Sequence, residues 1–177
     1  AKKKGLNVSC DIAAYQPLYN DEMLENFDTN YKVNPPLREK ADQDALIKGL
    51  KDGTIDVLVS NHCPHEDENK FLEFDLADFG LINLQTFAAQ LVSLSKSIEI
   101  ETLLEKVSDA PRKLLKRQPV IIDVSTKANL TLLDPNCEWT FAQENNFSKS
   151  KNSPWLGNTL KGKVVAVFNN GKQWLDV

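Results

Sequence analysis

The sequence lacks the features that would place the protein in a membrane, in an oxidising compartment or on nucleic acid. No apolar run approaches the roughly 20 residues that a membrane-spanning helix needs. Net charge is −4 with the two signs interspersed, so the basic face that nucleic-acid binding usually requires is missing. The cysteines Cys10, Cys63 and Cys137 are odd in number and far apart. They argue against a disulfide framework and favour a cytoplasmic setting.

The start of the chain also lacks familiar signals. No signal peptide is visible, and residue 1 is alanine rather than methionine. We therefore expect either a processed product or a piece of a longer protein. The 177 residues, with 41% hydrophobic and 26% charged side chains, have the composition of a globular protein that can bury a core.

Histidine is scarce too, and both copies stand at one place. His62 and His65 follow a short apolar run, Ile55 to Ser60, which a glycine and a proline bound. Such a run with β-branched members is typical of a buried strand in a parallel sheet. In α/β barrels the C-terminal ends of these strands carry the active site. The pattern therefore predicts that residues 61–65 form the functional tip.

Strand-like and helix-like segments alternate up to about residue 116, which is typical of an α/β fold with a parallel sheet or barrel. The expected strands are 6–13 and 55–60, and the expected helices are 41–51, 81–94 and 98–107, with a helix start at 20–22 and a short helix from 109. Short strands are expected at 120–124, 128–133, 138–141, 164–168 and 172–175, the last two joined by a hairpin at 169–171. We predict a division into residues 1–116 and a small β domain at 117–177.

Several short motifs occur in order along the chain. They are Tyr31 to Arg38 (Tyr-Lys-Val-Asn-Pro-Pro-Leu-Arg), Asp52 to Asp56 (Asp-Gly-Thr-Ile-Asp), Asn61 to His65 (Asn-His-Cys-Pro-His), Ala77 to Gly80 (Ala-Asp-Phe-Gly) and Ser150 to Gly157. Together they resemble the last two-fifths of a dihydroorotase, a cyclic amidohydrolase. A closed barrel of eight strand–helix units needs roughly 250 residues. The resemblance therefore implies a partial TIM-type barrel followed by part of a small β domain.

The resemblance also implies an activity and a site. The activity is the interconversion of dihydroorotate and N-carbamoyl-aspartate in pyrimidine biosynthesis, with zinc as the cofactor. Asn34 and His65, together with the backbone of Phe79 and Gly80, stand where the family contacts its substrate. Asn61 stands where the family has the aspartate that ligates zinc and acts as the general base.

Asn61 departs from the family pattern in a way that bears on catalysis. An amide has no usable basicity, and loss of a general base costs roughly 100- to 10,000-fold in rate. The family's paired histidines read Tyr15-Gln16 here, and its early His-x-His would lie outside this sequence. We therefore expect the chain alone to be inactive.

The same departures leave other functions open. One is a non-catalytic relative that keeps the pocket for binding or as a scaffold, for example with aspartate transcarbamoylase. An independent small domain with an unrelated function is a further alternative. Exposed sheet edges in a partial fold also favour a homo-oligomer.

Individual residues in the motifs have more than one interpretation. His62, Cys63 and His65 could share a metal ion, although adjacent residues rarely surround one, and a structural role is favoured for His62. Cys63 could be a nucleophile activated by a histidine, but a small packing residue is favoured. Asn34 could instead bond its own backbone in a turn. Asp56, within a strand, is expected to make a structural hydrogen bond.

Overall fold

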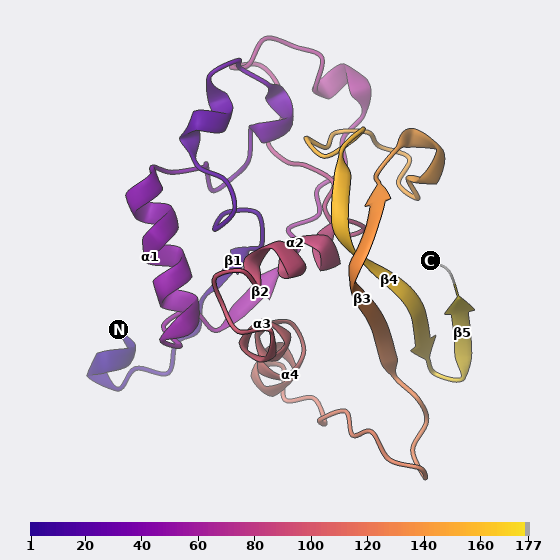
Figure 1. Ribbon diagram of the computed structural model, residues 1–177. Helices are drawn as coiled ribbons and strands as arrows, with labels where there is room; N and C mark the ends of the chain where they lie inside the picture. Colours follow the sequence, from indigo (N-terminus) through magenta and orange to yellow (C-terminus); the bar gives the residue numbers. More distant parts are fainter. Residues whose placement is uncertain (176–177) are drawn as a thin grey trace.

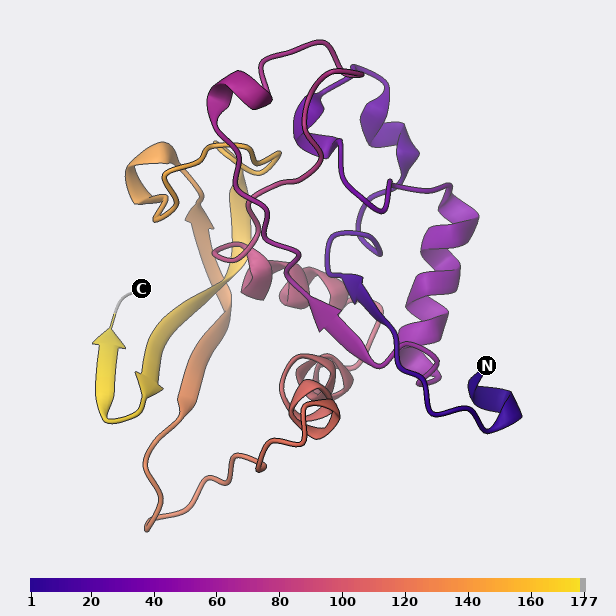
Figure 2. The same cartoon turned by 180° about the vertical axis from the view of Figure 1, so that it is seen from behind.

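Two short parallel strands bring the ends of two apolar runs side by side. Strand β1 (Asp11–Ala13) pairs with β2 (Val57–Val59), with Ile12 opposite Leu58. Parallel strands cannot be joined by a tight turn, and the connection here includes helix α1 (Lys40–Lys51). The computed structural model describes residues 1–175, and Figures 1 and 2 show it from opposite sides. Short 3-10 turns cover Lys2–Lys4, Asp21–Leu24, Thr29–Tyr31, Asp67–Asn69 and Gln143–Asn145.

Three helices follow β2 and cover the strand pair. They are α2 (Phe87–Leu94), α3 (Ile100–Val107) and α4 (Asp109–Leu114). Helix α3 packs against β2 and against both of the other two helices. Leu50 and Leu103 have no exposed surface and lie in one cluster with strand and helix side chains. This apolar cluster fixes the strand pair and therefore the place where the strands end.

The C-terminal part forms an antiparallel sheet. Strands β3 (Leu130–Thr140), β4 (Thr159–Asn169) and β5 (Lys172–Leu175) lie in that order. Asn170 and Gly171 have φ values of 51° and 81°, the left-handed pair that a two-residue hairpin turn requires. The predicted hairpin is therefore confirmed.

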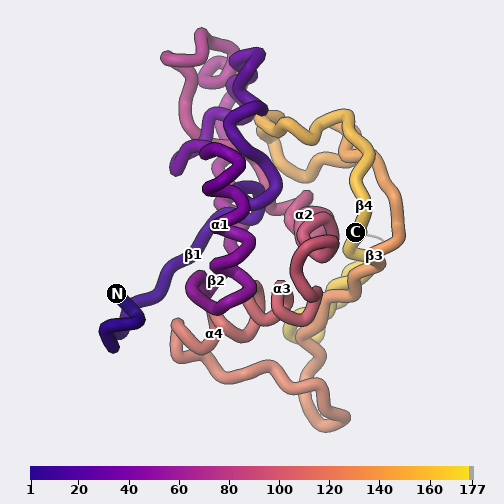
Figure 3. The backbone as a smooth tube through the Cα atoms, turned by 60° about the vertical axis from the view of Figure 1, so that its left-hand side comes forward, coloured from indigo at the N-terminus to yellow at the C-terminus, as the bar shows by residue number. Residues whose placement is uncertain are grey.

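The antiparallel sheet lies directly against helix α2, which separates it from the strand pair in Figure 3. Gly162 of β4 allows this approach, because a Cβ atom there would lie 2.5 Å from Cγ2 of Val92. A second buried cluster, which includes Tyr15, Phe141 and Trp155, joins the end of β1 to the sheet region. The sheet region is thus packed onto the elements that carry the predicted tip.

Three expected elements differ from the structure. Residues 6–10 are exposed, and the first strand begins only at Asp11, where pairing with β2 becomes available. The helix expected from residue 81 begins at Phe87, because the segment before it forms a bridge and turns against His62. The strand expected at 120–124 is absent, and Ile122 is 82% exposed on an extended segment with no strand partner. An extended segment that has no neighbouring strand leaves its backbone N–H and C=O groups without hydrogen-bond partners in the sheet.

The remaining expected elements agree with the structure within a few residues. Helices α1, α3 and α4 form where expected, as do β2, β4 and β5, and the helix start at 20–22 gives only a 3-10 turn. The strands expected at 128–133 and 138–141 are a single strand, β3, with register shifts in its pairing. The division at residue 117 stays a prediction. Within residues 1–175, no helix has the length and apolarity needed to cross a membrane.

Candidate functional site

The predicted tip lies where β1 and β2 end. Asn61, two residues beyond β2, adopts a left-handed φ of 47°, a conformation that asparagine tolerates better than most residues. His62 then pairs with Leu81 in an isolated parallel bridge. This bridge brings the segment after residue 60 beside the segment around residue 80. The polar segments around residues 61 and 80 therefore lie at the same edge of the fold.

Asn61 connects three segments of the chain at one corner of the site. Its Nδ2 donates to the Tyr15 hydroxyl oxygen at 2.7 Å and reaches the Asn34 carbonyl oxygen at 3.5 Å. Tyr15 is 1% exposed, and this burial raises the pKa of its hydroxyl, which the bond from Asn61 partly offsets. We call these three residues the Tyr15 corner. The corner is neutral and carries no free carboxylate.

His62 is held by the backbone on one side of its ring. Nδ1 accepts hydrogen bonds from the backbone N–H groups of Asn83 at 2.9 Å and Leu84 at 3.1 Å. Two donors aimed at Nδ1 place the ring proton of the neutral form on Nε2. Partial burial also lowers the pKa of His62, which favours the neutral ring. The predicted structural role of His62 is confirmed.

His65 lies within a tight group formed by the two loops. Its Nε2 contacts the Phe79 carbonyl oxygen at 2.9 Å and Cys63 Sγ at 3.4 Å, and its Nδ1 lies 3.4 Å from a carboxylate oxygen of Asp78. A Cβ atom on Gly80 would lie 2.7 Å from Cys63 Sγ, so only glycine fits without displacement. The structure thus brings together His65, Phe79 and Gly80, while Asn34 joins Asn61 at the Tyr15 corner.

Two buried lysines fix residues 66–80, which we call the clamped loop. Lys70 Nζ donates to the carbonyl oxygens of Asp78 at 2.8 Å and Gly80 at 3.0 Å. Lys32 Nζ donates to the Asp75 carbonyl oxygen at 2.9 Å and lies 4.7 Å from the centre of the Phe79 ring. Burial, with the nearby Lys32 ammonium, lowers the pKa of Lys70 to about 8. Charged donors therefore hold this loop against the rest of the site.

Asn152 ties the clamped loop to the C-terminal part of the chain. Its Nδ2 donates to the carbonyl oxygens of Cys63 at 2.9 Å and Gly80 at 3.2 Å, and its Oδ1 accepts from the His65 backbone N–H at 3.2 Å. Sequence reasoning quoted this residue within a motif but gave it no role. A buried position could have been expected from the flanking Ser-Pro-Trp, but its partners lie far away along the sequence.

The structure also gives the hydrogen-bond partners of Asp56 and the state of the cysteines. Asp56 accepts hydrogen bonds from the Cys10 backbone N–H at 2.9 Å and from Lys2 Nζ at 2.6 Å, so its predicted structural role is confirmed. These bonds hold the pKa of Asp56 below its usual value, the Lys2 bond most of all. All the cysteines are free thiols, and no disulfide framework is present.

The side chains at the tip do not fit the zinc ion that the resemblance implies. Among residues 1–175, no three His, Cys, Asp or Glu side chains lie close enough together to share a metal ion. Asn61 presents its amide N–H groups to oxygen atoms, and the neutral His62 ring already uses Nδ1 as an acceptor. Zinc needs three or four deprotonated ligands at about 2 Å. The donors at this edge therefore do not supply a zinc site.

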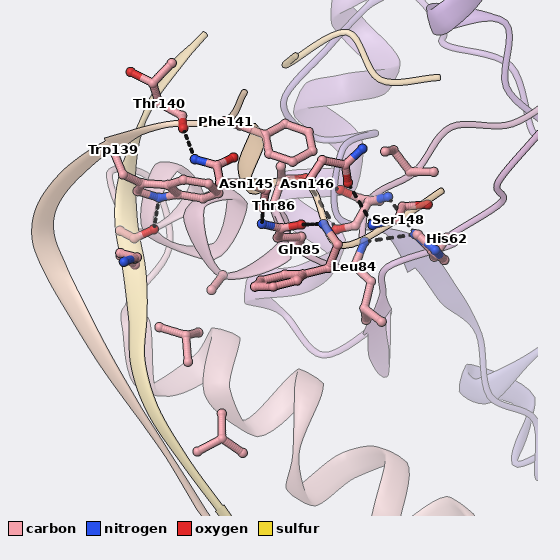
Figure 4. Close-up of a pocket in the computed structure, with 18 residues that line it drawn as sticks. His62, Leu84, Gln85, Thr86, Trp139, Thr140, Phe141, Asn145, Asn146 and Ser148 are labelled. Atoms are coloured by element: carbon pink, nitrogen blue, oxygen red, sulfur yellow. Dashed lines mark hydrogen bonds between the residues drawn. The ribbon is translucent and has the colours of Figure 1, made fainter. Parts of the chain in front are cut away.

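A cleft of about 710 Å³ opens beside the tip, between the turn before α2 and the antiparallel sheet. Figure 4 shows His62 and Leu84 at one end of it and Trp139 and Thr140 at the other. Its walls combine aromatic side chains with several side-chain amides, including Gln85. The sequence alone did not indicate this cleft, because residues from four separate segments form it.

Comparison with known proteins finds relatives that match nearly the whole chain. No family model matches the chain. The dihydroorotase of Carboxydothermus hydrogenoformans is 41% identical over 175 residues, which are 97% of this chain and 41% of that protein. The chain thus spans about two-fifths of the length of the curated relatives that it matches.

Solved structures give the same coverage. The L-hydantoinase of Arthrobacter aurescens superposes with a TM-score of 0.88 at 24% identity, over 99% of this chain and 41% of that one. An inactive dihydroorotase-like domain of a Chaetomium thermophilum CAD-like multifunctional protein superposes with a TM-score of 0.68 at 18% identity, over 97% and 45%. These likenesses establish a shared fold. In sequence, the chain aligns with about two-fifths of the length of the dihydroorotases, as a relative of their C-terminal portion.

Proposed function

We propose that this chain forms the C-terminal part of a dihydroorotase-type site for a cyclic amide, and that it does not turn over substrate alone. The proposed reaction is the interconversion of dihydroorotate and N-carbamoyl-aspartate. Sequence identity to dihydroorotases supports the substrate class, and the fold likeness supports a partial TIM-type barrel at 1–116 with a small β domain at 117–177. The strand ends and the clamped loop would form one side of the substrate pocket.

Four residues are proposed as substrate contacts. Asn34 has an exposed side chain beside the Tyr15 corner, where its amide can meet a ring or carboxylate. Phe79 is 53% exposed, and its ring backed by Lys32 can stack on a planar amide. Gly80 has no Cβ atom, so the backbone there can approach a bound substrate closely. His65 already uses both ring nitrogens within the chain, so a substrate would replace its contact with Asp78 or Phe79.

One observation carries the proposed inactivity. Asn61 donates its amide N–H to the Tyr15 oxygen at 2.7 Å, so the position that the family uses for a base carries a hydrogen-bond donor. A general base must instead accept a proton from the reacting water. The described residues also supply no zinc ligand set, so no catalytic step is assigned to zinc in this chain.

The test is a dihydroorotase assay of the full chain with zinc in the buffer, together with calorimetry using dihydroorotate. We expect a heat of binding and no turnover. The His65→Ala variant should weaken the heat, whereas Lys96→Ala, a change at an exposed lysine far from the tip, should leave it unchanged. Turnover by the full chain would overturn the proposed inactivity, and absence of binding would overturn the substrate assignment.

A second candidate is a binding or scaffold role without catalysis. The Tyr15 corner favours it, because a neutral hydrogen-bonded pair occupies the place of the base. The Chaetomium thermophilum domain, which has a similar fold, is described as inactive. That description applies to that protein alone. Partners under this proposal are a second copy of the chain or aspartate transcarbamoylase, in the cytoplasm. Co-sedimentation with purified aspartate transcarbamoylase, in the absence of any dihydroorotate heat, would favour this role.

A further inference from the structure

The Tyr15 corner joins segments that are distant in sequence but converge at one point. Tyr15 follows β1, Asn61 follows β2, and Asn34 belongs to the segment that leads toward α1. Tyr15 and Asn61 are 46 residues apart along the chain. Without the amide of Asn61, the ends of the two strands would have no side-chain bond between them at this corner. The strand pair itself is only three residues long on each side.

The orientation of the Asn61 amide is determined by its neighbours. The backbone carbonyl of Asn34 can only accept a hydrogen bond, so the amide nitrogen and not the oxygen must face it. The same nitrogen donates to Tyr15, whose hydroxyl therefore accepts and keeps its own proton. Both hydrogens of the amide nitrogen are thus directed at oxygen atoms of the protein.

We propose that Asn61 is a metal-free cross-link that holds the two strand ends and the Asn34 segment in place. Asn61 supplies the hydrogen-bond donor at the corner, and the corner keeps its shape without a cation. In a metal site, a cation performs this task by drawing several oxygen or nitrogen ligands together. Here a single amide nitrogen donates to the Tyr15 oxygen at 2.7 Å and lies 3.5 Å from the Asn34 carbonyl oxygen, which belongs to a different segment.

A carboxylate at position 61 would be a poor substitute in this setting. Its oxygen would face the Asn34 carbonyl oxygen, an acceptor against an acceptor, where the amide has a donor. The Tyr15 hydroxyl would turn its proton toward the carboxylate and engage it. Asn61→Asp therefore removes the donor that faces Asn34 and leaves the new carboxylate paired with Tyr15 rather than available to zinc.

This inference does not depend on the proposed substrate or on turnover. Its test uses thermal unfolding of the full chain, measured with added zinc chloride, with EDTA and with neither. We expect the wild-type midpoint to be the same in all three conditions. Asn61→Ala should lower the midpoint by about 2–4 °C, the shift expected for about 1 kcal/mol in a chain of this size, and zinc should raise the midpoint of neither Asn61→Ala nor Asn61→Asp.

Tyr15→Phe provides a second arm that keeps the packed ring and removes only the oxygen. If the two residues act through their shared bond, the double variant Tyr15→Phe with Asn61→Ala lowers the midpoint by less than the sum of the single changes. Asn129→Asp, at an exposed position in the segment before β3, adds the same charge and should leave the midpoint unchanged.

Three results would overturn the proposal. The first is a wild-type midpoint that rises with zinc or falls with EDTA. The second is a zinc-dependent rise in Asn61→Asp, which would mean that the carboxylate is free to ligate. The third is strict additivity of the Tyr15 and Asn61 changes, which would mean that their hydrogen bond contributes nothing to the folded state.

Discussion

The two ends of the candidate site are held together by different chemistry. The clamped loop is fixed by lysine ammonium groups and an asparagine amide that donate to its backbone carbonyls. The Tyr15 corner is fixed by one amide that donates to a phenol oxygen and a carbonyl. Charge-assisted bonds are about twice as strong as neutral ones. The loop is thus held mainly by lysine donors, whereas the corner is held by the amide of a single asparagine.

The two ends also differ in which of the proposed site residues they contain. The clamped loop contains Phe79 and Gly80, two of the four proposed substrate contacts, and His65 adjoins it. The corner carries Asn34, a further proposed contact, together with Tyr15 and Asn61, which differ from the family motifs that the sequence resembles.

Removal of the Lys70 ammonium should have the largest effect. Lys70→Met leaves the buried carbonyls of Asp78 and Gly80 with fewer donors and should lower the free energy of unfolding by about 2–4 kcal/mol. Urea unfolding measures it, with Lys96→Met at an exposed site as the matched control. A loss no greater than that of the control would mean that the loop is held by something other than charge.

Gly80→Ala tests how closely the clamped loop is packed. The new Cβ would meet Cys63 atoms at 2.7 Å, and φ at this position is 134°, which L-residues rarely adopt. We expect a loss of about 1–3 kcal/mol in urea unfolding. Gly171→Ala, in the hairpin turn with open space around it, supplies a control with positive φ but no close contact. Equal losses in the two variants would indicate backbone strain alone.

Tyr15→Phe should cost less than either change in the clamped loop. It removes one neutral acceptor from Asn61, which is itself exposed and can bind water instead. A loss of about 1 kcal/mol or less in the free energy of unfolding is expected. Calorimetric binding of dihydroorotate should persist. A loss exceeding that of Lys70→Met would reverse the contrast between the two ends.

The smallest effect is a pH dependence that belongs to Lys70. Its pKa is about 8 in the folded chain against an ordinary 10.5, so above pH 8 the unfolded chain binds more protons and stability rises with pH. A neutral amine still supplies two N–H donors for its two carbonyls. The gain between pH 7.5 and 8.5 should be below about 1.4 kcal/mol, the limit for one group over one unit. The difference between wild type and Lys70→Met should show this rise, and its absence would contradict the shifted pKa.

Local sequence signals predicted much of the fold. Helix α1 followed from its periodicity and the glycine beyond it, and the β4–β5 hairpin followed from Asn-Gly, because both depend on neighbours a few residues away. The segment at 81–86 was predicted as helix because its apolar pattern is helical. Backbone donors there bind His62 instead, a contact made across 21 residues. Tertiary contacts therefore overrode the local pattern.

The site was predictable in its location but not in its bonding. The place of the tip followed from a strand running into His62 and His65, and the family motifs named the residues around it. The partners of Asn61 and Asn152 could not follow from the sequence, since they lie 27 and 46 residues from Asn61 and between 72 and 89 residues from Asn152. The assignment of substrate roles to Asn34, His65, Phe79 and Gly80 stays a prediction.

Asn152 has a kinetic consequence. The loop around His65 is completed by a side chain that follows it by 87 residues, so the loop closes only after the intervening helices and β3 have been made. Contacts of such long sequence separation form late, because the entropy of closing a large loop is lost before the contact is gained. During synthesis the chain would therefore hold its strand pair and helices first. The recognition geometry would be acquired only once the C-terminal segment docks, which makes that docking the step that commits the chain to a functional shape.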